Sequence, residues 1–459
     1  MTPEAPPDPR PGTRPDLIAA GLGVVLVTAA IIIGTAIDRP NGTPGSLHLN
    51  WPPLYARWSP HLGPGTPAAL AVATAVIAYG PTLAVRLKWR ALVLTALAAS
   101  TAWIWSLALI DGWHDGIAER LTTKHEYLQV IDRFDDIPAT LRDFTNHILM
   151  SSPDNWPAHT AGHPPGATLT FVYLDRIGLG GGAWAGVWCI TIGATAVAAV
   201  LIALRALADE ETARRAAPFL VLAPAAIWIG TSADGYFAAV TAWMIALLAL
   251  AATRTTRFPA AAALGSGLLL GLTFILSYGL TLFGLVVAAV LLIARTWRPL
   301  PLLLLGAAVL PLALTLAGFN YWEAYHLLVE RYYEGAGGNR PYGYFVWSNL
   351  AGTVLVIGLA TVAGLRRTLA AVPAAVRRLR TGETTPADRL VALVLAALVA
   401  LLAANLSGMS KAETERIWLP FATFLLPAAA LLPATARRYW LAAQAVLALA
   451  INHLLFTGW

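Results

Sequence analysis

The sequence predicts an all-α membrane protein that crosses the bilayer about thirteen times. Of its 459 residues, 57% are hydrophobic and only 12% are charged, whereas a soluble domain has about 25% charged residues. Many apolar runs approach the roughly 20 residues that a helix needs to span a bilayer. Lys and Arg gather in alternate connecting segments, which is the pattern of a polytopic protein with a fixed orientation.

Each predicted span is an apolar run bounded by polar or turn-forming residues. The runs lie at about 17–37, 67–87, 91–110, 183–204, 217–231, 235–252, 259–276, 278–294, 299–318, 343–365, 388–406, 418–433 and 438–457. The shortest runs fit the bilayer by local thinning or by packing inside the bundle. The segment 164–178 carries Asp175 and Arg176 and is predicted to be a re-entrant or interfacial helix.

The distribution of basic residues places the N-terminus and the loop 366–380 in the cytoplasm, and the loop 111–182 outside. This topology also explains the net charge of +6, so nucleic acid is not an expected partner. We expect the chain to have four parts. They are a disordered cytoplasmic tail at 1–16, a membrane hairpin with an outer loop at 17–90, a core at 91–433 with the outer loop 111–182, and a last span at 434–459.

The outer loop 111–182 is long, acidic and rich in His, and it opens on Asp111 directly after an apolar run. A general base must be held near its substrate, with its pKa set by partial burial. A carboxylate at the end of a span meets both conditions, although it can also be a simple interfacial stop charge. Glu126, later in the loop, is an alternative base.

Two further polar positions lie near the predicted outer boundary. His163 precedes two prolines, which make a rigid corner and start a helix cleanly; it either contacts substrate or only forms that corner. His159 lies four residues earlier, but the prolines argue against a shared helix and thus against a metal site. Asp234 lies in a tight turn between spans, as a catalytic or substrate contact or as a helix N-cap.

Two late loops carry candidate phosphate ligands. The first contains Arg331, Tyr332 and Arg340 with a Gly-rich link, and is either a phosphate clamp or an ordinary mobile loop. The second contains Lys411, Glu415 and Arg416. An arginine at the head of a helix is disfavoured by the helix dipole unless it binds an anion or pairs with a neighbouring Glu413 or Glu415.

Three features in order resemble the GT-C superfamily of polytopic glycosyltransferases that use polyprenyl-phosphate sugars. They are Asp111 after a span, the Pro pair after His163, and Arg416 shortly before the LPF sequence at 419–421. The resemblance covers about 91–433 and is closest to bacterial proteins with a mannosyltransferase-like core. It implies an inverting transfer with Asp111 as base and Arg331, Arg340 or Arg416 on the donor phosphate.

The same resemblance implies the partners and the location. The donor is a polyprenyl-phosphate sugar, the acceptor is a lipid or a cell-envelope glycan, and the site lies on the outer face of a bacterial plasma membrane. No cofactor is expected, and assistance by a divalent metal stays open. A transporter or flippase, or a non-catalytic membrane protein, is the alternative. Charges at the span ends rather than at mid-bilayer depth favour the transferase.

Overall fold

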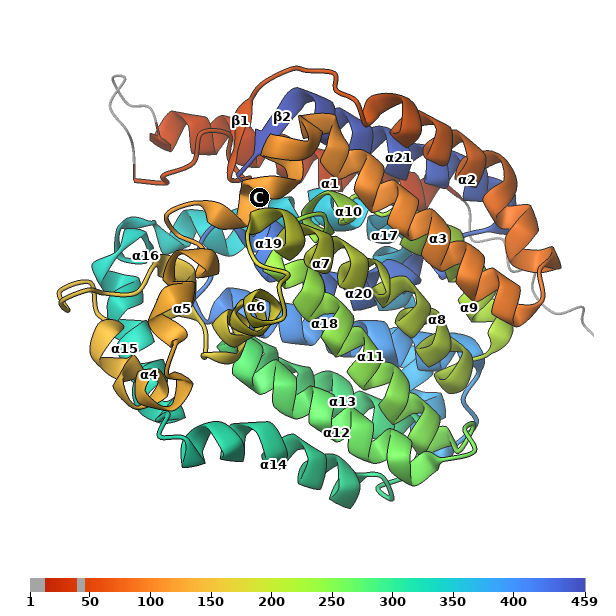
Figure 1. Ribbon diagram of the computed structural model, residues 1–459. Coiled ribbons are helices and arrows are strands. Elements are labelled where there is room, and N and C mark those ends of the chain that lie inside the picture. Colours follow the sequence, from red (N-terminus) through yellow and green to blue (C-terminus); the bar gives the residue numbers. More distant parts are fainter. Residues whose placement is uncertain (1–12, 39–45, 459) are drawn as a thin grey trace, which may run out of the picture.

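The computed structural model describes residues 13–38 and 46–458, and nearly all of its elements are helices (Figure 1). The helices are α1 (Thr13–Asp38), α2 (Thr66–Arg86), α3 (Trp89–Ala108), α4 (Ile137–Asp143), α5 (Ala158–Gly162), α6 (Gly166–Arg176), α7 (Gly182–Ala194), α8 (Ala196–Leu207), α9 (Glu210–Val221), α10 (Ala226–Ile229), α11 (Ala233–Thr253), α12 (Pro259–Leu276), α13 (Phe283–Ile293), α14 (Leu300–Leu316), α15 (Tyr321–Glu334), α16 (Ala336–Asn339), α17 (Tyr342–Thr381), α18 (Pro386–Leu406), α19 (Thr414–Ile417), α20 (Leu419–Leu425) and α21 (Arg437–Leu454). The strands are β1 (Ala56–Trp58) and β2 (Leu455–Thr457).

In the described part of the chain, eight helices are long and apolar enough to cross a membrane. Two bent pairs raise the number to ten if each pair is one span: α14 with α15, bent by 80°, and Leu419–Leu431 with Ala434–Leu454, bent by 111°. The prediction of an all-α polytopic protein is confirmed, but the count of thirteen is not. The predicted run 278–294 is a shorter apolar helix, and 217–231 is divided between the short helices α9 and α10.

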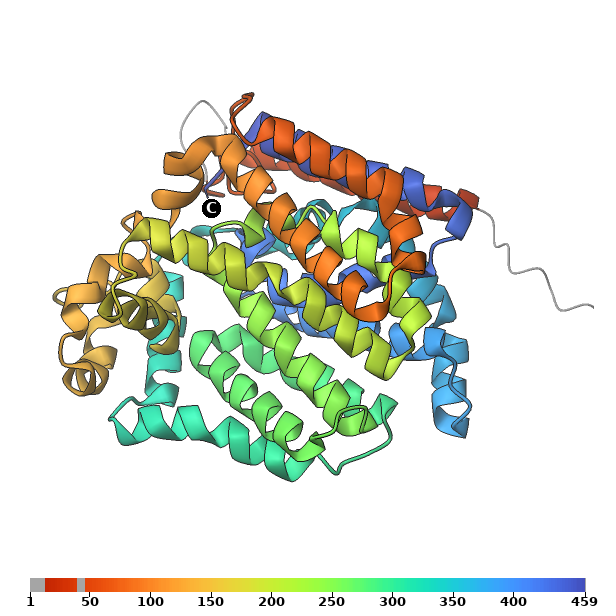
Figure 2. The ribbon, with the colours of Figure 1, turned by 45° about the vertical axis from the view of Figure 1, so that its right-hand side comes forward.

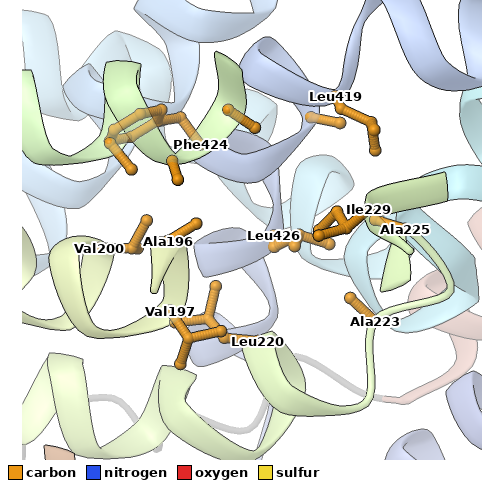
Figure 3. Packing of buried hydrophobic residues seen from close by; sticks show 14 of the residues in the cluster. Ala196, Val197, Val200, Leu220, Ala223, Ala225, Ile229, Leu419, Phe424 and Leu426 are labelled. Carbon is orange, nitrogen blue, oxygen red and sulfur yellow. The ribbon is translucent and has the colours of Figure 1, made fainter. Parts of the chain in front are cut away.

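Helix α11 lies at the centre of the bundle. Its most apolar stretch is 78% buried, against 22% for α1 and for α2, which lie at the rim. Helices α8, α12 and α20 pack against α11. Helices α2 and α3 cover one side of the bundle (Figure 2). Side chains such as Val200, Leu220 and Phe424 interlock where α8, α9 and α20 meet (Figure 3). A helix that is apolar on all sides belongs in such an interior position.

Helix α17 is broken at Gly358, whose φ of 75° ends the regular backbone there. A side chain at this position would collide with Gln444 of α21, because a Cβ atom would lie only 1.8 Å from its Oε1. The Gln444 amide donates a hydrogen bond to the Ile357 carbonyl, 3.0 Å away, and so satisfies backbone at the break. The single break lets α17 pack against α1, α18 and α21.

The cytoplasmic loop predicted at 366–380 is helical, because α17 continues to Thr381. Arg366 and Arg367 of this part ion-pair with the fully buried Asp16 of α1, and Arg367 lies 2.6 Å from its carboxylate. The helix α1 begins at Thr13, so residues 13–16 of the predicted tail are its first turn. Residues 1–12 of that tail lie outside the described residues.

The two strands bring distant parts of the chain together beside the polar insert, the name used here for residues 111–182. Strand β1 pairs antiparallel with β2, with Ala56 opposite Thr457. Arg120 of the polar insert donates a hydrogen bond to the Thr457 carbonyl. Elements α4 and α5 of the insert lie near α15 and α16 in Figure 1. The insert is therefore held by the end of the chain on one side and by α15 on the other.

Candidate functional site

A buried arginine, Arg416, joins several of the predicted site residues. It lies in the short helix α19, and its side chain is only 6% exposed. Its guanidinium lies 2.7 Å from the Asp234 carboxylate, 3.0 Å from Glu413 Oε2 and 2.8 Å from His159 Nε2. Burial alone would lower the pKa of Arg416, but the carboxylates of Asp234 and Glu413 outweigh it and raise the pKa above its usual value.

Asp234 lies in the first turn of α11, close to Ser232, which caps this helix. The N-cap of α11 is Ser232, whose hydroxyl accepts a hydrogen bond from the Asp234 N–H, 3.0 Å away. The Asp234 side chain is therefore free to face Arg416. The sequence left two interpretations for Asp234, a catalytic or substrate contact and a helix N-cap. The N-cap is Ser232, so the first interpretation remains.

His159 extends the network from Arg416 to Glu126. Because a guanidinium can only donate, the His159 Nε2 that faces it must accept, and the ring proton then lies on Nδ1. This Nδ1 is 2.9 Å from Glu126 Oε2, and Glu126 is buried. The result is a chain of groups from Glu126 through a neutral His159 to Arg416. From the sequence, His159 was considered only as a metal ligand, and this role was therefore missed.

A second cluster surrounds Asp111 at the end of the span Trp89–Asp111. The Asp111 carboxylate lies 2.7 Å from the Arg120 guanidinium and 2.8 Å from His61 Nε2. The side chains of Asp111 and Arg120 are 8% and 6% exposed. Arg120 is further fixed by Thr457 and by the Phe456 ring, over which it lies 4.5 Å from the centroid. Arg120 and His61 had no signal in the sequence, since their partners are set by the tertiary structure.

A narrow pocket separates the two clusters and has room for about one water molecule. Arg120 lines it from the Asp111 side, and Glu126, His159 and Arg416 line it from the other. The pocket therefore has two arginines and one carboxylate around a small space. This arrangement can bind an anionic group between the arginines and can exchange a proton with it or with a neighbouring molecule.

Other predicted phosphate ligands hold the loops around this network. Arg340 donates to the carbonyls of Leu47 and Lys411, at 3.1 and 2.8 Å, and lies 3.4 Å from Glu413. Arg340 and Arg416 thus share Glu413. Lys411 Nζ donates to the Gly337 carbonyl at 2.8 Å, and the Lys411 backbone N–H donates to the Tyr332 hydroxyl at 3.1 Å. These contacts fasten α15 and α16 to the segment that precedes Arg416.

Three more predicted residues, Arg331, His163 and Glu415, do not line the narrow pocket. Arg331 donates to the carbonyls of Ile148 and Trp156, so it anchors the polar insert to α15. His163 Nδ1 lies 2.8 Å from the His159 carbonyl, and burial lowers the pKa of His163 to about 4, so the ring is neutral. Glu415 accepts a hydrogen bond from the Tyr55 N–H, 2.9 Å away, and burial raises the pKa of its carboxyl to about 7.

His114, Asp115 and Glu119 form an exposed cluster with ligand atoms within 4.8 Å of one another. His114 bridges the two carboxylates, at 2.7 Å from Asp115 and 3.0 Å from Glu119. The hydrogen bond that His114 donates to Asp115 and the charge of Glu119 raise the pKa of His114. An exposed His between two acids is accounted for by these pairings, and it adds nothing to the buried network.

Comparison with solved structures identifies the fold. The chain is similar to the oligosaccharyltransferase of Archaeoglobus fulgidus in its apo form, with a TM-score of 0.50 and 13% identity over 80% of this chain and 56% of that one. The same enzyme tethered to an acceptor peptide containing the NVT sequon gives a TM-score of 0.41 and 14% identity, over 79% and 54%. The chain spans little more than half the length of this enzyme. No protein-family model and no curated protein sequence matches. The fold is thus a helical, multi-pass membrane fold of the GT-C type.

Proposed function

We propose that this protein is a membrane glycosyltransferase that moves a sugar from a polyprenyl-phosphate donor to a lipid or cell-envelope glycan, with inversion at the anomeric carbon. The observation that carries the proposal is the pocket between Arg120 and Arg416, with Asp111 and Glu126 beside it. Two buried arginines and two buried carboxylates beside the ends of apolar helices and in the polar insert suit a lipid-linked anionic donor and a hydroxyl acceptor. The GT-C-type fold supports the same reaction class.

In this proposal the donor phosphate binds between the two arginines, and the lining side chains move apart to admit it, because the narrow pocket itself has room for only about one water molecule. Arg120 is then shared by Asp111 and the phosphate, and Arg416 is shared by Asp234, Glu413 and the phosphate. A phosphate that draws Arg120 away frees one oxygen of Asp111, which the arginine otherwise occupies. Donor binding therefore makes Asp111 a stronger base in the complex that receives the acceptor.

The reaction is a single displacement. Asp111 takes the proton of the acceptor hydroxyl, the acceptor oxygen forms a bond to the anomeric carbon, and the bond from that carbon to the phosphate oxygen breaks. The lipid phosphate leaves as an anion, stabilised by Arg120 and Arg416, so no strong general acid is needed. Glu126 is the rival base because it lines the pocket directly, and Asp234 is a further rival. No cofactor enters these steps, and a divalent metal is not required.

The proposed orientation puts this site on the outer face of a bacterial plasma membrane, with the N-terminus in the cytoplasm. The ends of α1 support it. Asp38, at its C-terminal end, accepts a hydrogen bond from the Leu47 N–H beside Arg340, at the site. Asp16, at its N-terminal end, pairs with Arg366 and Arg367. These arginines therefore lie at the end away from the site, as expected for cytoplasmic charges.

The direct test incubates the purified protein in lipid vesicles with a radiolabelled polyprenyl-phosphate sugar and total membrane lipid or envelope glycan. Transfer of label to the acceptor is the expected result. Movement of the labelled lipid across the bilayer without transfer identifies a flippase instead. Binding without transfer or movement leaves a non-catalytic protein, and either outcome overturns the proposal.

A further inference from the structure

A second, wider pocket lies on the polar insert, between the 3-10 helix Tyr127–Phe134 and the segment 147–157. Its volume is about 550 Å³, within the range of small-molecule sites. The pocket is lined by the polar side chains of Gln129, Arg133, Asp154 and Asn155, among others. None of these side chains takes part in the clusters around Asp111 and Arg416, so the proposed reaction does not use them.

Two amide side chains in this pocket are held in defined orientations. Gln129 Nε2 donates to the Thr122 carbonyl at 2.6 Å, and Asn155 Nδ2 donates to the Met150 carbonyl at 3.2 Å. These bonds fix the donor end of each amide. The two amide oxygens have no hydrogen-bond donor among residues 13–38 and 46–458, so both remain acceptors for a ligand.

The arginine in the wall is fixed as well. Arg133 lies flat over the buried Trp156 ring, 3.5 Å from its centroid, and donates to the Asp154 carbonyl at 2.9 Å. Asp154 is exposed, and its φ of 48° is unusual for a residue with a side chain. The wall thus offers arginine N–H donors next to a carboxylate and two amide oxygens.

This set of groups fits a neutral polyhydroxyl ligand. A sugar hydroxyl both donates and accepts, so it can use amide oxygens, a carboxylate and arginine N–H groups together. A phosphate only accepts, so it could use Arg133 but would leave the two amide oxygens unpaired and would lie beside the Asp154 carboxylate, which repels it. Calcium needs six to eight oxygens at about 2.3–2.6 Å, which a pocket of about 550 Å³ does not gather around one point.

The wide pocket and the narrow pocket are joined by two short pieces of chain. Gln129 follows Glu126 in one turn, and its N–H donates to the Glu126 carbonyl at 3.3 Å. Pro157 lines the wide pocket, and His159, two residues later, lines the narrow one. A ligand in the wide pocket therefore lies next to the segments that position Glu126 and His159.

We propose that the wide pocket binds sugar units of a saccharide acceptor and directs its reactive hydroxyl toward the narrow pocket. The inference rests on the proposed glycosyltransferase activity for the direction of transfer. The binding of a neutral saccharide rests on the pocket alone. The acceptor is accordingly a glycan, or a lipid that already carries sugar, rather than a lipid with a bare alcohol.

The test has a binding arm and a kinetic arm. The purified protein in detergent is applied to an array of short neutral oligosaccharides of hexose and pentose units. Gln129→Ala and Asn155→Ala should each weaken binding of the retained saccharides by about 3- to 10-fold, the effect of one lost hydrogen bond. In the transfer assay the same variants should raise the acceptor KM by a similar factor, with kcat and donor KM unchanged.

The matched control is Asn146→Ala, which removes an exposed amide from the same insert outside both pockets. It should behave as wild type in both arms. Saccharide binding that is unaffected by Gln129→Ala and Asn155→Ala, while wild type transfers sugar, overturns the pocket and leaves the function intact. Saccharide binding that depends on these residues, in a protein that transfers no sugar, supports the pocket and overturns the proposed function. No retention of any saccharide, or retention only with added calcium, also overturns the pocket.

Discussion

Two buried aspartates pair with arginines near opposite ends of the bundle, and their surroundings differ. Asp16 is a single carboxylate held by Arg366 and Arg367, whose side chains are 28% and 13% exposed. Asp234 shares the single, 6% exposed Arg416 with Glu413, and His159 brings Glu126 into the same network. The first cluster has more arginines than acids, and the second has more acids than arginines.

The difference separates an ion pair that only holds two helices together from a functional site. The cluster of Asp16, Arg366 and Arg367 is called the fastening here. At Asp16 the two arginines join α1 to α17 by sharing one carboxylate. At Arg416 the network borders a pocket, and a further arginine, Arg120, faces it from across the space. A buried ion pair alone is weak support for function, whereas convergent charges around a cavity are typical of active sites. Changes at the second cluster should therefore alter turnover, and changes at the first should alter stability.

The largest expected effect is at Asp111. Asp111→Asn keeps the shape and one hydrogen-bonding oxygen but removes the basic carboxylate. We expect turnover per folded molecule to fall by about 10²–10⁴-fold, the usual cost of losing a general base, while donor binding stays close to wild type. Transfer of radiolabelled sugar measures the turnover. Thermal unfolding is measured alongside, because Asp111 and Arg120 form a buried pair whose loss also lowers stability. Near-full activity in Asp111→Asn together with an inactive Glu126→Gln or Asp234→Asn reassigns the base, and full activity in all three removes the mechanism.

The next effect is at Arg416. Arg416→Ala should weaken donor binding by about 1.5–3 kcal/mol, since a hydrogen bond to a charged group is lost. Arg416→Lys should not restore it, because an ammonium cannot present a planar fork to Asp234 and a phosphate together. Equilibrium binding of the labelled donor measures both variants, with a folding check by thermal unfolding. Unchanged donor affinity in both variants takes Arg416 out of the site.

The fastening should respond in the opposite way. Asp16→Asn leaves Arg366 and Arg367 without their carboxylate, and we expect about 1–3 kcal/mol of stability to be lost, below the cost of a fully buried pair because Arg366 is partly exposed. Denaturant unfolding in detergent measures it. Turnover per folded molecule should equal that of wild type. A loss of turnover larger than the loss of folded protein would contradict the division into fastening and site.

The smallest effect is a pH dependence of stability at Glu415. Burial raises the pKa of this carboxyl from 4.5 to about 7, so the folded protein binds its proton more tightly than the unfolded chain does. Its contribution to stability is complete below about pH 4.5 and declines as the pH rises toward about 7. Glu415→Gln should flatten the unfolding midpoint between these values. The exposed Glu119→Gln is the control, and equal slopes in all three proteins would contradict the assignment.

The sequence by itself determined the class of the protein and the location of its chemistry. Apolar runs and sparse charges are sufficient for a polytopic helical fold, because a bilayer requires every backbone group to be satisfied within a segment. The polar insert and the segment around Arg416 were recognisable because polar and charged residues are rare between apolar spans. Asp111, Glu126, Asp234 and Arg416 were all named from their places near span ends, and all four lie in or beside the two clusters.

Only the tertiary structure decided which of these residues meet. His61 reaches Asp111 because strand β1, just before it in the chain, pairs with β2 beside the insert. The same pairing places Thr457 where its carbonyl holds Arg120. Arg331 was grouped with Arg340 and Arg416 from sequence, yet it binds insert carbonyls, because α15 turns by 80° from α14 and carries it there. Charged side chains have no periodic pattern in sequence that names their partners. Pairing depends on which helix ends the packed bundle places together, and only the folded chain fixes that.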